Sequence, residues 1–164
     1  MNMLDSVRDW LLVPENPSVR YFALTDLLDR PADAPEVSET RQAIMMTGDV
    51  PRLLEGQTEG GYWGRPEAFY SPRFTGAVWR FMLLAEFGAD GSHPQIRKTA
   101  EHLFEYSQME TGGFASRGVT KRSPTDRETP CLTGNMVWSY IRLGYLDDPR
   151  VQKGIERMYW WGEA

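Results

Sequence analysis

Apolar residues recur every three to four positions along most of this chain, and no stretch alternates between apolar and polar residues for long. Such spacing predicts α-helices, because residues three or four apart share one helix face. The predicted helices cover residues 4–12, 18–29, 36–46, 50–55, 75–87, 94–106, 132–143 and 149–161. We therefore expect an all-α protein that forms a single domain over residues 1–164.

The predicted helices in the second half of the chain are of two kinds. Residues 75–87 and 132–143 are apolar around most of their circumference, which predicts burial on both sides. Residues 94–106 and 149–161 each begin at a proline and carry apolar side chains mainly on one face. Because the two kinds alternate, the repeating unit is a buried helix, a short turn and an amphipathic helix.

A short motif links these units and occurs twice. Residues 57–63 read QTEGGYW and residues 108–114 read QMETGGF, so both fit Q-x-x-x-G-x-[W/F], with a spacing of 51 residues from Gln57 to Gln108. A repeat of that length is typical of repeat architectures. We expect the motif to be structural: the glutamine amide satisfies unpaired backbone groups at a helix end, and the glycine allows a turn that a Cβ would block.

The motif resembles the QW motif of the terpenoid cyclase and protein prenyltransferase superfamily. The residues that carry the resemblance are Gln57, Gly61 and Trp63, then Gln108, Gly112 and Phe114. Over residues 18–161 it implies an α/α toroid, in which inner helices alternate with outer helices.

The number of repeats implies that the ring is incomplete. The sequence holds about three helical hairpins, fewer than a closed toroid needs. A third motif would begin near residue 159, where the chain reads YWWGEA and presents apolar surface. We therefore expect a partial toroid, either as a fragment of a larger chain or as a homo-oligomer whose copies cover each other's open ends.

Two functions are possible, the first implied by the resemblance and the second favoured by the lack of the family's complete catalytic motifs. One is an isoprenoid or terpenoid cyclase-like or prenyltransferase-like protein that acts on or binds an apolar polyprenyl-type ligand in a central cavity. The other is a non-catalytic helical-repeat module that associates with itself or with a partner. Whether the protein is an enzyme stays open.

Candidate catalytic and metal-binding residues lie before the second inner helix. The cyclases of the family use a D-x-D-D motif to protonate an alkene, and this chain has none; the nearest acids to an inner-helix start are Asp126 and Glu128. The prenyltransferases bind zinc through Asp, Cys and His, for which Cys131 is the candidate ligand. The family's D-x-C pattern is absent and both histidines fall in the outer layer, so a zinc site lacks a complete ligand set and no cofactor is expected.

Candidate ligand-binding residues lie on or beside the inner helices. Aromatic side chains would line an apolar cavity, and an arginine would face an anionic group such as a diphosphate. The residues predicted for these roles are Tyr70, Arg73, Phe74, Trp79 and Trp138.

Composition narrows the range of partners. The net charge is −5 and no cluster of Lys and Arg stands out, which argues against nucleic acid. No apolar run has the length of a membrane span, and the single cysteine excludes an internal disulfide. We therefore expect a cytoplasmic protein.

Overall fold

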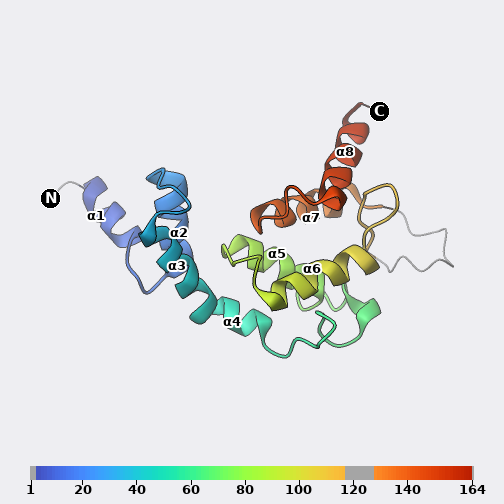
Figure 1. Cartoon of the computed structure of the whole chain (residues 1–164), viewed down its shortest axis with the longest axis horizontal. Coiled ribbons are helices and arrows are strands. Elements are labelled where there is room, and N and C mark those ends of the chain that lie inside the picture. Colours follow the sequence, from blue (N-terminus) through green and yellow to red (C-terminus); the bar gives the residue numbers. More distant parts are fainter. Residues whose placement is uncertain (1–2, 117–127, 164) are drawn as a thin grey trace. The chain divides into compact units, whose positions relative to one another are not determined.

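The computed structural model describes residues 3–116 and 128–163 (Figure 1). Within these residues the chain forms eight α-helices and no β-strand, which confirms the all-α prediction. The helices are α1 (Met3–Leu11), α2 (Pro17–Phe22), α3 (Pro35–Met46), α4 (Asp49–Leu54), α5 (Ala77–Glu86), α6 (Pro94–Tyr106), α7 (Pro130–Arg142) and α8 (Pro149–Glu163). A π-helix, η1 (Ala23–Leu27), and a 3-10 helix, η2 (Pro66–Ala68), complete the described elements.

Proline sets the start of the amphipathic helices, as predicted. Pro35, Pro94 and Pro149 are the first residues of α3, α6 and α8, where a missing N–H costs nothing. Pro130 is likewise the first residue of α7, so this helix begins two residues before the predicted start.

The predicted continuous helix over residues 18–29 is wrong in its second half, where α2 widens into η1. The Leu28 N–H donates to the Ala23 carbonyl, 3.1 Å away, which is the five-residue spacing of a π-helix. The Thr25 hydroxyl donates to the Tyr21 carbonyl at 3.1 Å, a side-chain bond that competes with the backbone ladder.

The described helices fall into two compact units. The N-terminal unit is Met1–Glu55 with Phe87–Asp90, and the C-terminal unit is Gly56–Glu86 with Gly91–Ala164. In the N-terminal unit α2 packs against α3, and the Ser18 hydroxyl donates to the carbonyl of Phe87 at 2.8 Å. That hydrogen bond fixes the inserted segment Phe87–Asp90 to its unit.

The C-terminal unit consists of two helical hairpins. Helix α5 packs against α6 and α7, and α7 packs against α8, so the two helices predicted as inner ones are neighbours (Figure 1). These two helices were predicted to be buried on both sides, yet one face of each is partly exposed: Leu83, Trp138 and Ile141 are 39%, 41% and 36% exposed. These side chains lie on the part of each helix that its neighbours in the unit leave uncovered.

Tyr140 of α7 is the centre of the core of this unit. Its ring is fully buried and stacks on Phe104 of α6 with the centroids 4.2 Å apart. The hydroxyl donates to the carbonyl of Ala100 at 2.8 Å. Burial raises the pKa of Tyr140 well above its usual value, so the phenol keeps the proton that this hydrogen bond needs.

The glutamines of the repeated motif make the same contact in both copies. The Gln57 amide donates to the carbonyl of Gln95, and the Gln108 amide to that of Arg150, both at 2.8 Å. Gln95 and Arg150 are each the second residue of an amphipathic helix, α6 or α8. Each amide therefore ties its loop to the first turn of the next amphipathic helix, rather than capping unpaired groups as predicted.

The glycines of the motif confirm the prediction that a side chain would be blocked. Gly61 has φ +82°, and a Cβ there would lie 2.3 Å from the carbonyl oxygen of Lys98. Gly112 has φ +95°, and its Cβ would lie 2.3 Å from the carbonyl oxygen of Lys153. Because Lys98 and Lys153 are each the fifth residue of their helix, the loops approach α6 and α8 at equivalent points.

Candidate functional site

Three of the predicted ligand-binding residues form one aromatic cluster at the start of α5. The ring of Trp79 lies 5.2 Å from that of Tyr70 and 5.2 Å from that of Phe74, centroid to centroid. The Trp79 indole N–H donates to the carbonyl of Tyr70 at 2.8 Å, which fixes the plane of the indole. We call Tyr70, Phe74 and Trp79 the aromatic cluster.

The loop before α5 folds back on the helix and so brings these rings together. Phe69 is buried, and its carbonyl accepts the N–H of Val78 at 3.0 Å. Gly76 lies so close to this segment that a Cβ would be 2.4 Å from the carbonyl oxygen of Phe69. The Thr-Gly pair before α5 thus allows the close approach that places Tyr70 against Trp79.

Phe74 is held in an unusual conformation at the surface. Its φ is +68°, a left-handed value that costs a residue with a Cβ about 1–2 kcal/mol. The side chain is nevertheless 67% exposed, so burial of the ring does not offset this cost. A strained backbone at an exposed aromatic ring makes Phe74 a candidate functional residue.

Arginines flank the aromatic cluster. The guanidinium of Arg73 lies 5.7 Å from the ring centroid of Phe74, and that of Arg80 lies 4.8 Å from the ring centroid of Trp63. Arg80 also donates to the carbonyl of Thr75 at 3.1 Å, and partial burial lowers its pKa. Arg73 is exposed, so its positive charge is available beside the apolar rings.

Trp138, the fourth predicted aromatic residue, lies on the exposed stripe of α7. It is 41% exposed, and the guanidinium of Arg142 lies 5.7 Å from its ring centroid. Within the described residues no ring contact joins Trp138 to the aromatic cluster.

Of the two candidate acids, Asp126 lies outside the described residues. Glu128 is described, and both of its carboxylate oxygens accept hydrogen bonds from the protein. The Glu128 carboxylate accepts a hydrogen bond from the Thr111 hydroxyl and one from Arg157 Nε, the latter at 2.6 Å. Its side chain is only 9% exposed. The Glu128 carboxylate therefore links Thr111, in the second motif loop, to Arg157 on α8.

The candidate zinc ligand, Cys131, is the second residue of α7 and is exposed. Residues 3–116 and 128–163 contain no group of three or more His, Cys, Asp or Glu side chains placed to hold a metal ion. His102 is buried on α6 between the rings of Tyr62 and Tyr106, with centroids 4.9 Å and 4.5 Å away. Its Nε2 has no hydrogen-bond partner.

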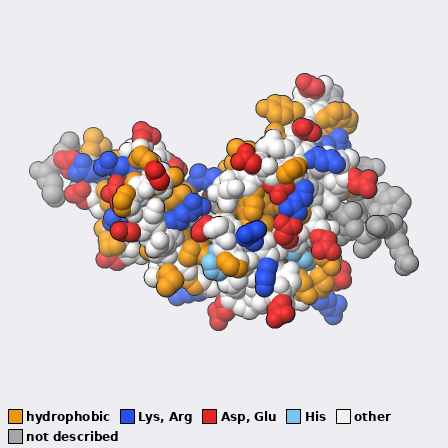
Figure 2. All heavy atoms as spheres, viewed as in Figure 1, with side chains coloured by type: hydrophobic (Ala, Val, Ile, Leu, Met, Phe, Trp, Pro, Cys, Tyr) orange, Lys and Arg blue, Asp and Glu red, His pale blue; other side chains and the backbone are white. Residues whose placement is uncertain are grey.

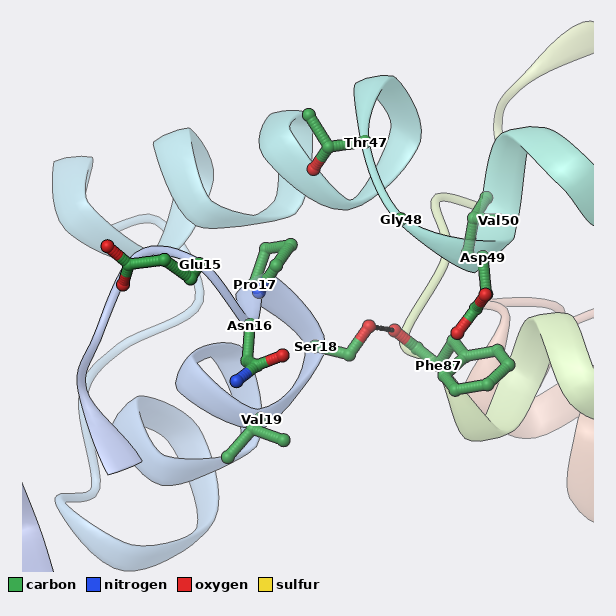
Figure 3. Close-up of a pocket in the computed structure, with 10 residues that line it drawn as sticks. All are labelled: Glu15, Asn16, Pro17, Ser18, Val19, Thr47, Gly48, Asp49, Val50 and Phe87. Atoms are coloured by element: carbon green, nitrogen blue, oxygen red, sulfur yellow. Dashed lines mark hydrogen bonds between the residues drawn. The ribbon is translucent and has the colours of Figure 1, made fainter. Parts of the chain in front are cut away.

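A pocket that the sequence does not reveal lies in the N-terminal unit (Figure 3). It has a volume of about 140 Å³ between the ends of α2, α3 and α4, and its charged lining residues are Glu15 and Asp49. The Ser18–Phe87 hydrogen bond crosses it. Because small-molecule sites span about 300–1,000 Å³, this pocket is a weaker candidate than the aromatic cluster.

No helix within residues 3–116 and 128–163 has the length and apolar character needed to cross a membrane. Comparisons of the chain with protein-family models, with curated proteins and with solved structures find no match.

Proposed function

We propose that this protein is a helical-repeat binding protein of α/α-toroid architecture whose aromatic cluster takes an apolar, polyprenyl-type ligand. The observation that carries the proposal is Phe74, an exposed ring on a left-handed backbone in contact with Trp79. The toroid is supported by the two hairpins of the C-terminal unit, whose motif loops contact α6 and α8 at equivalent points.

The chemistry of the surface indicates an amphiphilic ligand. The rings of Tyr70, Phe74 and Trp79 offer apolar area to a hydrocarbon chain. Arg73, beside Phe74, offers a cation to an anionic head group such as a diphosphate. A ligand with a hydrocarbon chain and an anionic head group would contact both the aromatic rings and Arg73.

Binding is better supported than catalysis. A cyclase-like reaction needs an acid that can give a proton to the ligand. Glu128 instead bonds to Thr111 and Arg157, which favours a structural role for this residue.

A non-catalytic interaction module is the second candidate function. The exposed Leu83 on α5, with Trp138 and Ile141 on α7, favours it, because exposed apolar side chains on neighbouring helices suit a protein partner as well as a lipid.

Calorimetric titration with farnesyl diphosphate and with farnesol tests the proposal. We expect the diphosphate to bind about tenfold or more tightly, since a hydrogen-bonded charge is worth about 1.5–3 kcal/mol. Phe74→Ala should weaken the binding of both compounds, and Arg73→Gln only that of the diphosphate.

Tyr159→Ala is the matched control, because Tyr159 is a similarly exposed aromatic residue on α8. Mass spectrometry of the same mixtures reports any product and separates turnover from binding. Absence of binding at millimolar concentration, or equal affinity in wild type and Phe74→Ala, would refute the proposal.

A further inference from the structure

His102 of α6 is a buried ionisable residue that packs against the loop before α5. It is 4% exposed, and its ring lies between those of Tyr62 and Tyr106, with centroids 4.9 Å and 4.5 Å away. In Figure 2 histidine side chains cover only small areas of the face in view. Because Tyr62 belongs to the loop and Tyr106 to α6, the imidazole packs between the two segments.

The hydrogen bonding of the imidazole indicates its protonation state. The ring bonds to the backbone of Pro66, which has a carbonyl but no N–H, so the imidazole is the donor. Its Nε2 is buried and has no hydrogen-bond partner, so the donor is Nδ1. The ring is therefore neutral, with an unshared lone pair on Nε2.

The loop that His102 contacts is fixed on both sides of that contact. We call residues 62–68 the strap; it includes η2, which packs on α6 (Figure 1). Before the strap, the Gln57 amide bonds to α6 at 2.8 Å. After it, the carbonyl of the buried Phe69 accepts an N–H of α5 at 3.0 Å. Between these two points the strap meets His102 through one aromatic ring and one carbonyl.

The charged side chains around His102 do not offer Nε2 an acceptor. Glu67, in the strap, is exposed, and its charge raises the pKa of His102 by less than burial lowers it. The phenols of Tyr62 and Tyr106 face the imidazole with their rings. The other charged side chains on α5 and on the adjoining turns of α6 do not bond to the imidazole; they are Arg80, Glu86, Lys98 and Glu105.

From this arrangement we infer that His102 is a pH-sensitive switch whose protonation releases the strap from α6 while the rest of the C-terminal unit stays folded. The added proton would lie on Nε2, where a buried N–H has no acceptor. Release of the strap exposes the imidazolium to water, so acid favours the released form. The switch acts on the loop whether or not a ligand binds the aromatic cluster.

Hydrogen–deuterium exchange of the full chain, followed by mass spectrometry at a series of pH values, tests the switch. The reporter is the Ala68 amide, which donates to the Arg65 carbonyl at 3.0 Å in a single turn that is unstable away from α6. The reference is the Leu143 amide at the end of α7, which donates to a carbonyl of that helix at 3.0 Å.

Exchange rates are divided by the intrinsic rate at each pH. Protection of Ala68 should fall about three- to tenfold between about pH 7.5 and pH 5.5, because linkage to one proton allows at most about tenfold per pH unit. Leu143 should keep its protection, since it lies in a part of the unit that stays folded.

Two substitutions identify the group responsible. His102→Phe keeps an aromatic ring between the two tyrosines but takes no proton, so its strap should show no pH dependence. Glu67→Gln removes the charge that raises the pKa of His102, so the loss of protection should move to lower pH. His93→Gln, at the other histidine of the chain, is the control and should behave like wild type.

Three results would overturn the switch: a wild-type strap that stays protected to about pH 5.5, an equal loss in His102→Phe, or a loss shared by Ala68 and Leu143, which would mean general unfolding. Circular dichroism shows whether each variant is folded. If His102→Phe does not fold, Glu67→Gln decides, and an unmoved midpoint in that variant overturns the switch.

Discussion

The side-chain amide of Gln57 lies 2.8 Å from the backbone carbonyl of Gln95 and so joins two segments 38 residues apart. The same amide donates to the Thr99 hydroxyl at 2.7 Å. Gln108 repeats the contact with Arg150. The bond holds a long loop on helix α6, and the loss of stability on removing it can be measured.

Gln57→Ala should lower the free energy of unfolding by about 1–3 kcal/mol, because it removes two side-chain hydrogen bonds that tie the loop to α6. Urea denaturation followed by circular dichroism measures this. Gln42→Ala, at an exposed position on α3, is the control and should change stability by less than about 0.5 kcal/mol. Equal effects of the two substitutions would show that the Gln57 contact contributes nothing.

Comparing the stabilities of Gly61→Ala and Gly56→Ala separates the cost of backbone strain from the cost of steric overlap. Both glycines have positive φ, +82° and +71°, so alanine at either position costs about 1–2 kcal/mol. Only at Gly61 would the new Cβ meet another segment, at 2.3 Å from Lys98, whereas Gly56 has open space. We expect the loss of stability at Gly61 to be at least twice that at Gly56, and similar losses would rule out the close approach.

His102 should make stability depend on pH. Burial lowers its pKa below the usual 6.5, so the unfolded chain binds the proton more readily than the folded one. The folded state is therefore favoured above pH 6.5 and loses stability as pH falls from there through the lower folded pKa. His102→Phe should flatten this part of a stability profile, measured by urea denaturation at a series of pH values.

His93→Gln is the control for this profile, since the chain has only these two histidines. It should retain the decline of the wild type. A profile that His102→Phe leaves unchanged would mean that His102 is not the group responsible.

Tyr140→Phe should cost about 1–2 kcal/mol while leaving the aromatic core in place. The change removes only the hydroxyl that bonds Ala100 and leaves that buried carbonyl short of one partner. Thermal unfolding of this variant can be compared with that of Tyr159→Phe, which alters an exposed ring and should be neutral. A neutral Tyr140→Phe would mean that the hydrogen bond to Ala100 makes no net contribution to stability.

Much of the fold could be predicted because its signals are local. Helix periodicity predicts all eight helices, and the prolines mark the starts of α3, α6 and α8. The glycine of the motif indicates a left-handed turn without knowledge of the rest of the chain, whereas the backbone that would block a Cβ there belongs to a distant helix. The π-helical turn after α2 differs from the prediction of a continuous helix, and the Thr25 hydroxyl bonds to the Tyr21 carbonyl at this point.

The candidate site could be predicted only in part. Tyr70, Phe74 and Trp79 are close in sequence, and the sequence places all three near the start of one helix. The pairing of Glu128 with Arg157 spans 29 residues, and no spacing rule links them. The pocket near Ser18 has no sequence signal, since it is formed by segments from several elements.

The sequence by itself determined the helices and the proline starts of α3, α6 and α8, because these follow from the geometry of a few neighbouring residues. The partners of the motif glutamines depend on the tertiary structure, since Gln57 and Gln108 bond to backbone 38 and 42 residues away. Only the tertiary structure decided which aromatic rings are core and which are surface. Tyr140 and Trp138 lie two residues apart on the same helix, yet one is fully buried and the other 41% exposed. The difference arises because burial depends on which neighbouring helices cover each face, and that is a property of long-range packing.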